Sequence, residues 1–299
     1  MSDLEVRGVT YVVGRTLLDD VTLTFRGGEV CAVSGPSGSG KTTLLSIAGG
    51  LVEPTSGSTA YPAGPDARSK GTSMWQGTGD PRPEVAFVLQ VYGLVPILSA
   101  RENVSIALRA RGVAPAEADE LAEAALARFH IADLGDRQVE ELSGGQMQRV
   151  ACARGFVVGA DILLADEPTS ELDEGNRSLV LEELRAEAER GAVVVVATHD
   201  PAVVDACDRH YALDEGVLVE HVPPRTRRAQ GSAAREPAPV AQAPAAAAVS
   251  APAVGAPAVG APAVGEPPRH RQEEPFETPR PSAPQEPPAR SPFARPVDQ

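Results

Sequence analysis

The sequence predicts an α/β domain with a parallel sheet core, an antiparallel β edge and a helical insertion, followed by a Pro-rich tail. Three observations predict this fold class. Short apolar runs alternate with helical patterns, the first thirty residues carry a hairpin-like pattern, and proline is concentrated near the end of the chain. Eighteen of the 28 prolines lie between Pro223 and Pro296, so we place the folded domain at 1–222 and the tail at 223–299.

Four short apolar runs are typical of β-strands in the core of such a sheet. The last two are apolar at every position, which is typical of central parallel strands that are covered on both faces. The four runs are 30–33, 85–89, 162–165 and 193–196. Residues 1–30 carry spaced apolar side chains instead, and this pattern predicts antiparallel hairpin strands at the edge.

Helical patterns separate these strands. The segment 41–51 follows a Gly-rich turn, and the segment 143–157 begins with a serine that suits an N-cap. Two more helices are expected at 116–129, which is rich in Ala, Glu and Leu, and at 174–190, which is amphipathic. The stretch at about 95–142 therefore predicts a helical insertion between strands.

The distribution of charge changes at the same boundary as the proline content. The whole chain holds 27 basic and 41 acidic residues, a net charge of −14. The tail holds nine arginines and seven acidic residues, so 1–222 holds 18 basic and 34 acidic residues and a net charge of −16. The strongly negative charge of residues 1–222 argues against nucleic-acid binding, because phosphate neutralisation needs Lys and Arg. It also argues against adhesion to an anionic membrane surface.

Other features exclude further classes of protein. No run approaches the length of about 18 apolar residues that a membrane-spanning helix needs, so we expect no direct membrane insertion. The first residues are acidic and lack the pattern of a secretion signal. The three cysteines are far apart and odd in number, which suits neither a disulfide framework nor a zinc site. Their apolar neighbours predict small buried side chains in a cytoplasmic protein.

The tail is different in kind from the rest of the chain. Three tandem copies of Ala-Pro-Ala-Val-Gly, at 251–255, 256–260 and 261–265, precede sequence rich in Pro, Arg and Glu. This composition cannot bury enough apolar surface to offset chain entropy, so it predicts disorder with polyproline II character. Two interpretations stay open, a solvated extension and a Pro-rich ligand for a partner domain.

Residues 35–43 satisfy the pattern G-x-x-x-x-G-K-[ST] of a phosphate-binding P-loop. A strand-like run precedes them and a helix-forming run follows, which is the context that this motif needs. The glycines allow backbone N–H groups to close around the α- and β-phosphates, and the helix N-terminus adds a positive end. We expect Lys41 against the β- and γ-phosphates and the Thr42 hydroxyl on Mg²⁺. The loop residues are Gly35, Pro36, Ser37, Gly38, Ser39, Gly40, Lys41, Thr42 and Thr43.

Two adjacent carboxylates end the apolar run 162–165. Asp166 stands at the carboxyl end of the predicted strand, where it is placed to hold the Mg²⁺ shell. Glu167 follows at once, before the turn expected at Pro168, and can accept a proton from an attacking water. An Asp followed by a Glu indicates hydrolysis rather than phosphoryl transfer to a metabolite.

Leu-Ser-Gly-Gly-Gln at 142–146 is the most specific pattern in the sequence. Ser143 predicts an N-cap, and the two glycines after it expose the first backbone N–H groups of the following helix, which makes a second anion site. With the P-loop upstream and the acidic pair downstream, the sequence resembles the nucleotide-binding subunit of ATP-binding cassette (ABC) transporters. The resemblance covers essentially all of 1–222.

The resemblance implies a P-loop NTPase core that binds ATP and Mg²⁺ at sites shared between two copies of the chain. In this family the Leu-Ser-Gly-Gly-Gln motif, which is called the signature, contacts the γ-phosphate bound to the opposite subunit. Ser143, Gly144 and Gly145, with Gln146 completing the motif, are therefore expected to act in trans. Asp173 matches the D-loop, which crosses the dimer interface in the family.

Three further residues match family positions. Gln90 follows the run 85–89 and matches the Q-loop glutamine, which senses Mg²⁺ and the lytic water and couples to the membrane partner. His199 follows the run 193–196 and matches the switch histidine that contacts the γ-phosphate. Tyr11 lies 24 residues before Gly35, where the family commonly stacks an aromatic ring on adenine. The alternative for Tyr11 is an ordinary strand aromatic on a sheet face.

Two positions depart from the family pattern. Glu171 stands where the family usually has Ala, which bears on the geometry of the D-loop. Between Gly64 and Pro83 the usual charged, helix-like stretch is missing, so we expect a loop there that includes Trp75, the one tryptophan of the chain.

The resemblance also implies an assembly. One chain carries one P-loop and one signature, so a symmetric head-to-tail homodimer is expected to close around two ATP molecules. Useful work then requires a separate integral-membrane permease, with 91–104 as the expected docking surface. The chain is expected to lie peripherally on the inner face of the cell membrane through this permease.

The matching segments are most like those of the group that serves lipoprotein release, macrolide-type export and division-associated permeases. Two function classes stay open, export or extraction through a permease, and ATP-driven mechanotransmission to an extracytoplasmic partner without translocation. An importer ATPase for amino acids or ions is a further alternative. A soluble ABC ATPase outside transport is less well supported, because such proteins usually carry two cassettes or a long coiled coil.

Overall fold

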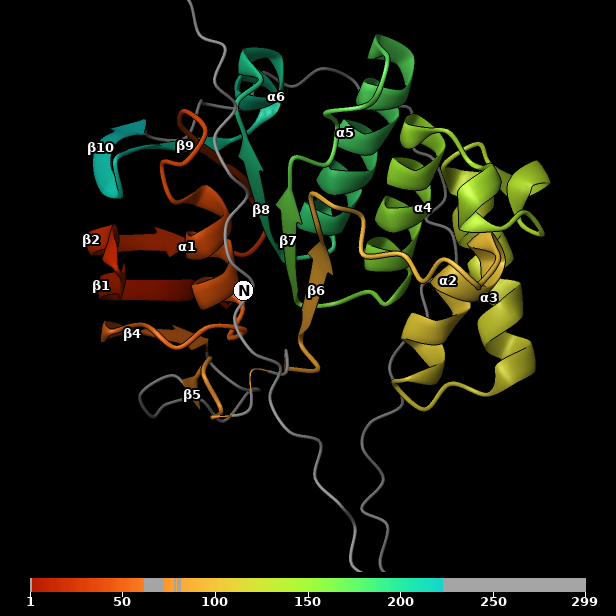
Figure 1. The fold of residues 1–299 in the computed structure, drawn as a ribbon, viewed down its shortest axis with the longest axis horizontal. Helices are drawn as coiled ribbons and strands as arrows, with labels where there is room; N and C mark the ends of the chain where they lie inside the picture. Colours follow the sequence, from red (N-terminus) through yellow and green to blue (C-terminus); the bar gives the residue numbers. More distant parts are fainter. Residues whose placement is uncertain (1, 62–71, 78, 80–81, 223–299) are drawn as a thin grey trace, which may run out of the picture. The chain divides into compact units, whose positions relative to one another are not determined.

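The computed structural model describes residues 2–61, 72–77, 79 and 82–222, and in this part it confirms the predicted α/β fold class. Figure 1 shows an antiparallel sheet, a largely parallel sheet and a group of helices. The predicted tail lies outside the described residues, as does most of the loop expected between 64 and 83. Trp75 is described, and it lies in a segment without helix or strand.

The antiparallel sheet has the strand order β2-β1-β4-β5. Its first two strands form the expected hairpin, which pairs Leu4 with Phe25 at one end and Val13 with Arg15 at the other. The strands are β1 (Leu4–Val13), β2 (Arg15–Phe25), β4 (Ser56–Tyr61) and β5 (Thr72–Ser73). One side of the hairpin faces the core, because Leu4, Val6 and, beyond a register shift, Val9 are fully buried.

The second sheet has the order β10-β9-β3-β8-β7-β6 and is parallel from β9 to β6. Its strands are β3 (Val30–Ser34), β6 (Val85–Val88), β7 (Ile162–Asp166), β8 (Val193–Thr198), β9 (Arg209–Asp214) and β10 (Val217–Val222). All side chains of β7 and β8 are buried. Successive residues contribute to two different hydrophobic clusters, for example Val194 to one and Val195 to the other. Both faces of the sheet are therefore covered, as the continuous apolar runs predicted.

Six α-helices and two 3₁₀ turns are present in the described residues. They are α1 (Lys41–Ala48), α2 (Ala100–Arg109), α3 (Pro115–Arg128), η1 (Ala132–Leu134), η2 (Val139–Glu141), α4 (Gly144–Val157), α5 (Glu174–Glu189) and α6 (Pro201–Ala206). Helices α2 and α3 lie within the predicted helical insertion and confirm it, and they pack against each other and against α4 beside the parallel sheet (Figure 1). None of the helices in the described part of the chain combines the length and apolar character that a membrane span needs.

The order of the parallel strands gathers four functional segments at one edge of the sheet. The P-loop follows β3, the two adjacent carboxylates end β7, His199 follows β8, and Gln90 lies just beyond β6. These four strands are neighbours in the order β3-β8-β7-β6. Ligands of open α/β sheets bind outside the carboxyl ends of such strands, so this edge is where the chemistry is expected.

Helix α4 packs closely against β6 at Gly155. A Cβ atom placed on Gly155 would lie 2.7 Å from the Val88 Cγ2 atom and 3.2 Å from the Phe87 carbonyl oxygen. Glycine at this position therefore allows the backbone of α4 to approach β6 within a distance that no other residue permits.

We predict that Gly155→Ala lowers the free energy of unfolding by about 1–3 kcal/mol, because the added methyl group overpacks the contact between α4 and β6. Urea denaturation of the full chain measures this change. The matched control is Gly175→Ala in α5, where the new Cβ atom meets only Asp173 Oδ1, at 3.5 Å. That variant should keep its stability or gain up to about 1 kcal/mol from helix propensity. Equal losses in the two variants would contradict the packing argument.

Candidate nucleotide site

The P-loop, residues 35–40, joins β3 to α1, and its backbone is adapted to surround an anion. Gly38 and Gly40 have φ angles of 82° and 103°, which residues with a side chain rarely adopt. Helix α1 has no side-chain cap and no acidic residue in its first turn. Its first N–H groups therefore remain available, and its positive end is not neutralised within the helix.

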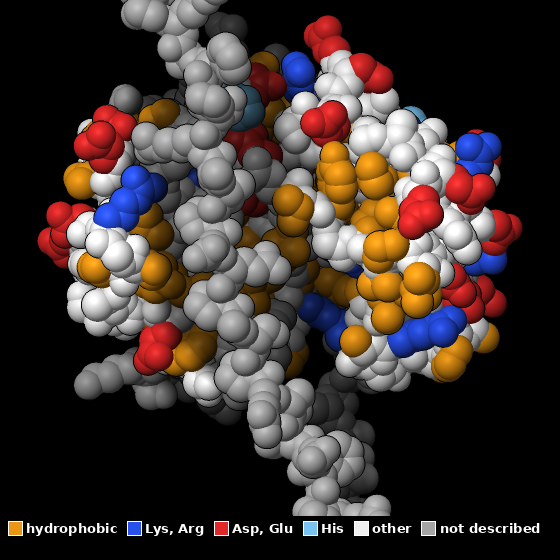
Figure 2. All heavy atoms as spheres, viewed as in Figure 1, with side chains coloured by type: hydrophobic (Ala, Val, Ile, Leu, Met, Phe, Trp, Pro, Cys, Tyr) orange, Lys and Arg blue, Asp and Glu red, His pale blue; other side chains and the backbone are white. Residues whose placement is uncertain are grey.

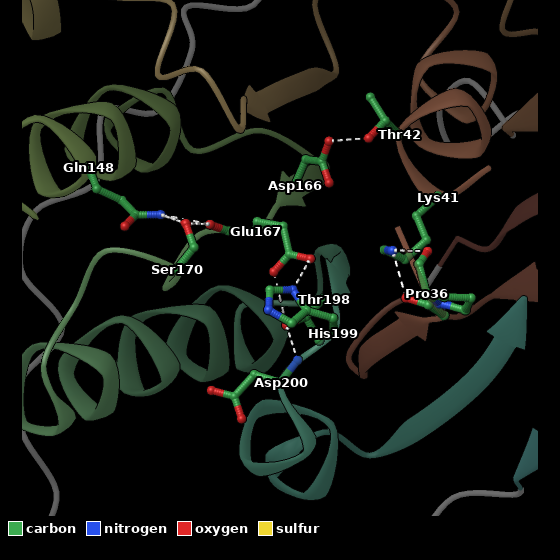
Figure 3. Close-up of polar contacts among 11 residues, drawn as sticks. Pro36, Lys41, Thr42, Gln148, Asp166, Glu167, Ser170, Thr198, His199 and Asp200 are labelled. Atoms are coloured by element: carbon green, nitrogen blue, oxygen red, sulfur yellow. Dashed lines mark hydrogen bonds and ion pairs between the residues drawn. The ribbon is translucent and has the colours of Figure 1, made fainter. Parts of the chain in front are cut away.

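Lys41 is folded back over this loop. Its Nζ atom donates hydrogen bonds to the carbonyl oxygens of Gly35 (2.8 Å) and Pro36 (3.0 Å), and the side chain is buried. These bonds place a positive charge against the loop (Figure 3). The arrangement suits a phosphate, which can replace the carbonyl oxygens as the partner of the ammonium group.

A cavity of about 600 Å³ brings most of the predicted residues together. It is lined by Arg15, Leu17, Pro36, Ser37, Gly38, Gly40, Lys41, Thr42, Thr43, Gln90, Asp166, Glu167 and His199. Gly35 and Ser39 belong to the same loop but do not line the cavity. Tyr11 does not line it either, since it lies in β1 opposite Leu18 and packs partly buried against the core.

Thr42 and Asp166 form the part of the cavity that suits a metal ion. The Thr42 hydroxyl donates a hydrogen bond of 2.6 Å to Asp166 Oδ2. Burial raises the pKa of the Asp166 carboxyl above its ordinary value, and the charge of Glu167 adds to the rise, while the Thr42 hydrogen bond and Lys41 oppose it. A hydroxyl and a carboxylate at this spacing, with the Gln90 amide on the same cavity, supply the oxygen ligands that Mg²⁺ prefers.

Glu167 is held at the end of β7 by contacts on both sides of its peptide and on its carboxylate. Its backbone has a φ of 50°, in the left-handed region, and its N–H donates to the Ala197 carbonyl at 2.9 Å. His199 Nδ1 lies 2.7 Å from Oε1, and the Thr198 hydroxyl donates to Oε2 at 3.3 Å. The carboxyl is buried, whereas His199 is 68% exposed, so the imidazole links the buried acid to the open side of the cavity.

The signature lies at the start of α4, away from this cavity. Ser143 caps the helix as predicted, because Ser143 Oγ accepts from the Gln146 N–H and Gln146 Oε1 accepts from the Ser143 N–H. None of Ser143, Gly144, Gly145 and Gln146 lines the P-loop cavity. The structure therefore does not bring the two predicted anion sites of one chain together.

The segment after the acidic pair lies directly against this helix start. A Cβ atom on Gly145 would lie 2.8 Å from the Glu171 carbonyl oxygen, so the second signature glycine permits this close approach. The Glu171 carboxylate lies beside Gly144. Because this position is usually Ala in the family, the Glu of this chain adds a negative charge next to the signature. Asp173 caps α5, because its Oδ1 atom accepts from the Asn176 N–H at 2.9 Å.

Sequence reasoning missed Gln148, which donates to the Glu167 carbonyl oxygen at 2.6 Å (Figure 3). It also missed Thr198 as a partner of the Glu167 carboxylate, and Arg15 and Leu17 in the cavity wall. Only Gln148 has a signal in the sequence. It lies four residues before Cys152, on the buried stripe of the helix, where an amide needs a polar partner.

The parallel sheet, the P-loop and the acidic pair at the strand ends define an ATPase of the P-loop class. A sequence model of the ABC transporter family matches residues 18–170 of the chain. The chain therefore belongs to the ABC transporter family of ATP-binding proteins.

Relatives and solved structures agree with this assignment. The chain is 38% identical over 209 residues to an uncharacterized ABC transporter ATP-binding protein of Mycobacterium tuberculosis (strain ATCC 25618 / H37Rv), a match that covers 70% of this chain and 62% of that protein. It is 40% identical over 224 residues to the macrolide export ATP-binding/permease protein MacB of Rhodopseudomonas palustris (strain HaA2), covering 74% of this chain and 34% of MacB.

The dimeric structure of MJ0796, a bacterial ABC transporter cassette, matches with a TM-score of 0.66 and 29% identity over 75% of this chain and all of that one. The same cassette bound to ADP and Pi, in a dimeric post-hydrolysis state, gives a TM-score of 0.65 and 30% identity with the same coverage of both chains.

We predict that Asp166→Asn raises the melting temperature of the nucleotide-free protein and abolishes Mg²⁺-dependent ATP hydrolysis. The folded state binds the Asp166 proton more tightly than the unfolded chain, because burial raises this pKa. The ionised carboxylate therefore destabilises the fold at neutral pH, and the destabilisation fades as the pH falls through the raised pKa. Asn removes the charge and can still accept the Thr42 hydrogen bond.

Thermal unfolding at neutral and at acidic pH measures this effect, and the gain in stability should shrink at acidic pH. The matched control is Asp161→Asn, an exposed position just before the opposite end of β7, which should change neither quantity. A melting temperature that falls in Asp166→Asn would contradict this argument, because it would show that the carboxylate stabilises the nucleotide-free fold.

Proposed function

We propose that the chain hydrolyses ATP as a homodimer and drives a separate membrane permease of the export or extraction type. The observation that carries this proposal is the separation of the two anion sites. The cavity of one chain holds the P-loop, the acidic pair and His199, and the signature lies elsewhere on the surface of the same chain. A second copy that brings its signature to this cavity completes the site. The dimeric form of the related cassette MJ0796 supports this assembly.

In this proposal the P-loop binds the triphosphate of ATP. Gly35 to Thr43 surround the phosphates through backbone N–H groups, and Lys41 leaves the carbonyl groups that it now bonds and pairs with the β- and γ-phosphates. Gly35 makes the turn possible, because a Cβ atom there would collide with the Leu213 carbonyl oxygen. Tyr11 stacks on adenine in this scheme, which requires its ring to turn from the core towards the mouth of the cavity.

Thr42, Asp166 and Gln90 hold Mg²⁺, which neutralises charge on the phosphates when it is bound. Glu167 is the general base. Its carboxylate accepts a proton from the attacking water while the water oxygen forms the bond to the γ-phosphorus and the bond to the bridging oxygen breaks. Thr198 and His199 orient the two carboxylate oxygens, and the exposed His199 ring contacts the γ-phosphate.

The second protomer supplies the rest of the site. Ser143, Gly144 and Gly145 present the N-terminus of α4 to the γ-phosphate, while Gln146 keeps this helix start in shape through its capping bond. Asp173 lies at the interface, and ATP binding closes the dimer. Residues 1–222 make up the complete cassette in this proposal, and 223–299 form an extension to it.

The permease is proposed to dock on an apolar patch around the loop between β6 and α2. This docking patch consists of the exposed side chains of Leu89, Val91, Val95, Ile97 and Ile106. Figure 2 shows hydrophobic side chains gathered on the face that carries this loop. Ile97 and Val91 are 81% and 80% exposed, and an apolar patch of this kind on a soluble domain indicates a protein partner.

The loop is tied to α4 by Arg154. Its guanidinium donates to the carbonyl oxygens of Gly93 (2.5 Å) and Tyr92 (2.6 Å), and Tyr92 and Gly93 both have positive φ angles. Movement of the docking patch is therefore passed to the helix that carries the signature. MacB relatives are named as export ATP-binding/permease proteins, which supports a permease partner and the export type, with the chain on the inner face of the membrane. In the alternative function, mechanotransmission, the same dimer hydrolyses ATP in the same way, but the permease acts on an extracytoplasmic partner and translocates no substrate.

We predict that Glu167→Gln traps an ATP-bound dimer. The carboxamide keeps the size of the side chain but cannot accept the proton of the attacking water, so ATP binds and is not hydrolysed. Size-exclusion chromatography with ATP and Mg²⁺ detects the dimer, and phosphate release measures turnover. The exposed Glu123→Gln on α3 is the matched control and should turn over like the wild type. Wild-type turnover in Glu167→Gln would remove this residue as the base.

We predict that Ile97→Asp and Val91→Asp release the chain from membranes and leave its own ATPase activity unchanged. A carboxylate in the docking patch cannot be desolvated against an apolar partner surface. Sedimentation with membrane vesicles from the source organism, and with protein-free liposomes of the same lipids, measures the binding. The control is Val219→Asp on β10, a valine that is 61% exposed outside the patch. Binding of the wild type to the liposomes would contradict a protein partner.

A further inference from the structure

Gln148 is a buried amide that connects the signature helix to the end of β7. It lies on α4, its side chain is 2% exposed, and both ends of its amide are hydrogen bonded. Its Nε2 atom donates to the Glu167 carbonyl oxygen at 2.6 Å and to Ser170 Oγ at 3.3 Å. Its Oε1 atom accepts from the Glu171 N–H at 2.7 Å. Figure 3 shows the amide pointing at the Glu167 peptide.

The first of these bonds acts on a strained part of the backbone. A residue with a side chain rarely adopts the φ of 50° seen at Glu167, and such a conformation persists only where its surroundings fix it. The Ala197 carbonyl holds the N–H of this residue from β8, and Gln148 holds its carbonyl from α4. The direction of the Glu167 side chain therefore depends on the position of α4.

The second bond joins the same helix to the D-loop. The Glu171 N–H donates to Gln148, and the Glu171 carbonyl lies against Gly145, where a Cβ atom would come within 2.8 Å. One residue of the D-loop is thus held by the start of α4 through its carbonyl side and by Gln148 through its N–H. The signature, the D-loop and the Glu167 peptide have to move together.

We propose that Gln148 is a positioning residue that makes the geometry of the base Glu167 depend on the signature helix of the same chain. The inference rests on the proposed homodimer, in which this signature contacts the ATP that is bound by the P-loop of the partner. Occupation of one site then sets α4, and Gln148 passes that position to the base of the other site. The amide does not touch the nucleotide, so it acts on hydrolysis and not on binding.

The variants that test this role are Gln148→Leu and Gln148→Glu. Leu fills the same space and makes neither bond. Glu keeps an oxygen for the Glu171 N–H but cannot donate to the Glu167 carbonyl, so it isolates the bond to the base. The Ser170 hydroxyl still donates to that carbonyl at 3.2 Å, which limits the loss of stability. The matched control is Ser105→Ala, which removes one hydrogen bond from a fully buried side chain on α2.

We expect kcat to fall more than about tenfold in both Gln148 variants, with KM for ATP unchanged, while Ser105→Ala keeps both constants. In the Glu167→Gln background, Gln148→Leu should still form the ATP-bound dimer. A wild-type kcat in either Gln148 variant overturns the proposal. So does a loss of kcat that is matched by an equal loss of ATP affinity or of dimer, because that result assigns Gln148 to the structure of the signature.

The dependence between the two sites is tested by the ATP concentration dependence of the rate. ATP-driven closure makes both dimers cooperative in ATP, and Gln148→Leu should lower the Hill coefficient without bringing it to unity, because the link between the sites adds to the cooperativity of closure only in the wild type. An unchanged Hill coefficient overturns the link. These outcomes are separate from a failure of the proposed function, which shows itself as a wild-type chain that neither hydrolyses ATP nor forms a dimer.

Discussion

The rest of the site depends on the burial of two adjacent carboxylates at the end of β7. Asp166 and Glu167 are 5% and 6% exposed, and an ionised carboxylate in such a place is costly unless hydrogen bonds and positive charge surround it. Each surrounding element therefore supplies a partner for one of these two residues. Thr42 of the P-loop helix and Thr198 and His199 at the end of β8 contact the carboxylates, and Gln148 reaches from α4 to the backbone carbonyl of Glu167. The P-loop helix and the end of β8, which supply these partners, also line the proposed nucleotide cavity.

The same contacts explain why the fold is organised around α4. The helix begins at the signature, touches the D-loop at Gly145, holds the Glu167 peptide through Gln148 and contacts the loop between β6 and α2 through Arg154. Close packing of Gly155 against β6 keeps its far end in place. In the proposed homodimer, α4 is therefore the element whose position the signature, the D-loop, the Glu167 peptide and the loop after β6 all share.

The sequence predicts those parts of this arrangement that depend on local chemistry. The buried strands are continuous apolar runs, and the P-loop needs Gly and Lys at fixed positions, so β7, β8 and the loop are predicted in the right places. Helix α2 is missed as a separate element because Asn103 and Ser105 are buried on it while Ile106 is exposed, which inverts the usual pattern. Thr198 is missed for another reason, because its partner Glu167 is 31 residues away and no spacing rule connects the two. The place of Gln148 on a buried stripe indicates that its amide needs a polar partner, but it does not indicate which one.

Two residues of the signature have structural roles within one chain, which distinguishes them from the residues that remain for binding an anion. Gln146 is used by the capping bond and Gly145 by the contact with the D-loop, so both residues are accounted for within one chain. Ser143 is exposed, and α4 has no acidic residue in its first turn. A helix start of this kind suits an anion, although the Glu171 carboxylate lies beside Gly144, and the P-loop cavity of the same chain does not include it. In the proposed homodimer, the γ-phosphate held by the P-loop of the other copy is the anion that this helix start meets, so the proposal makes the dimer, and not the single chain, the unit that hydrolyses ATP.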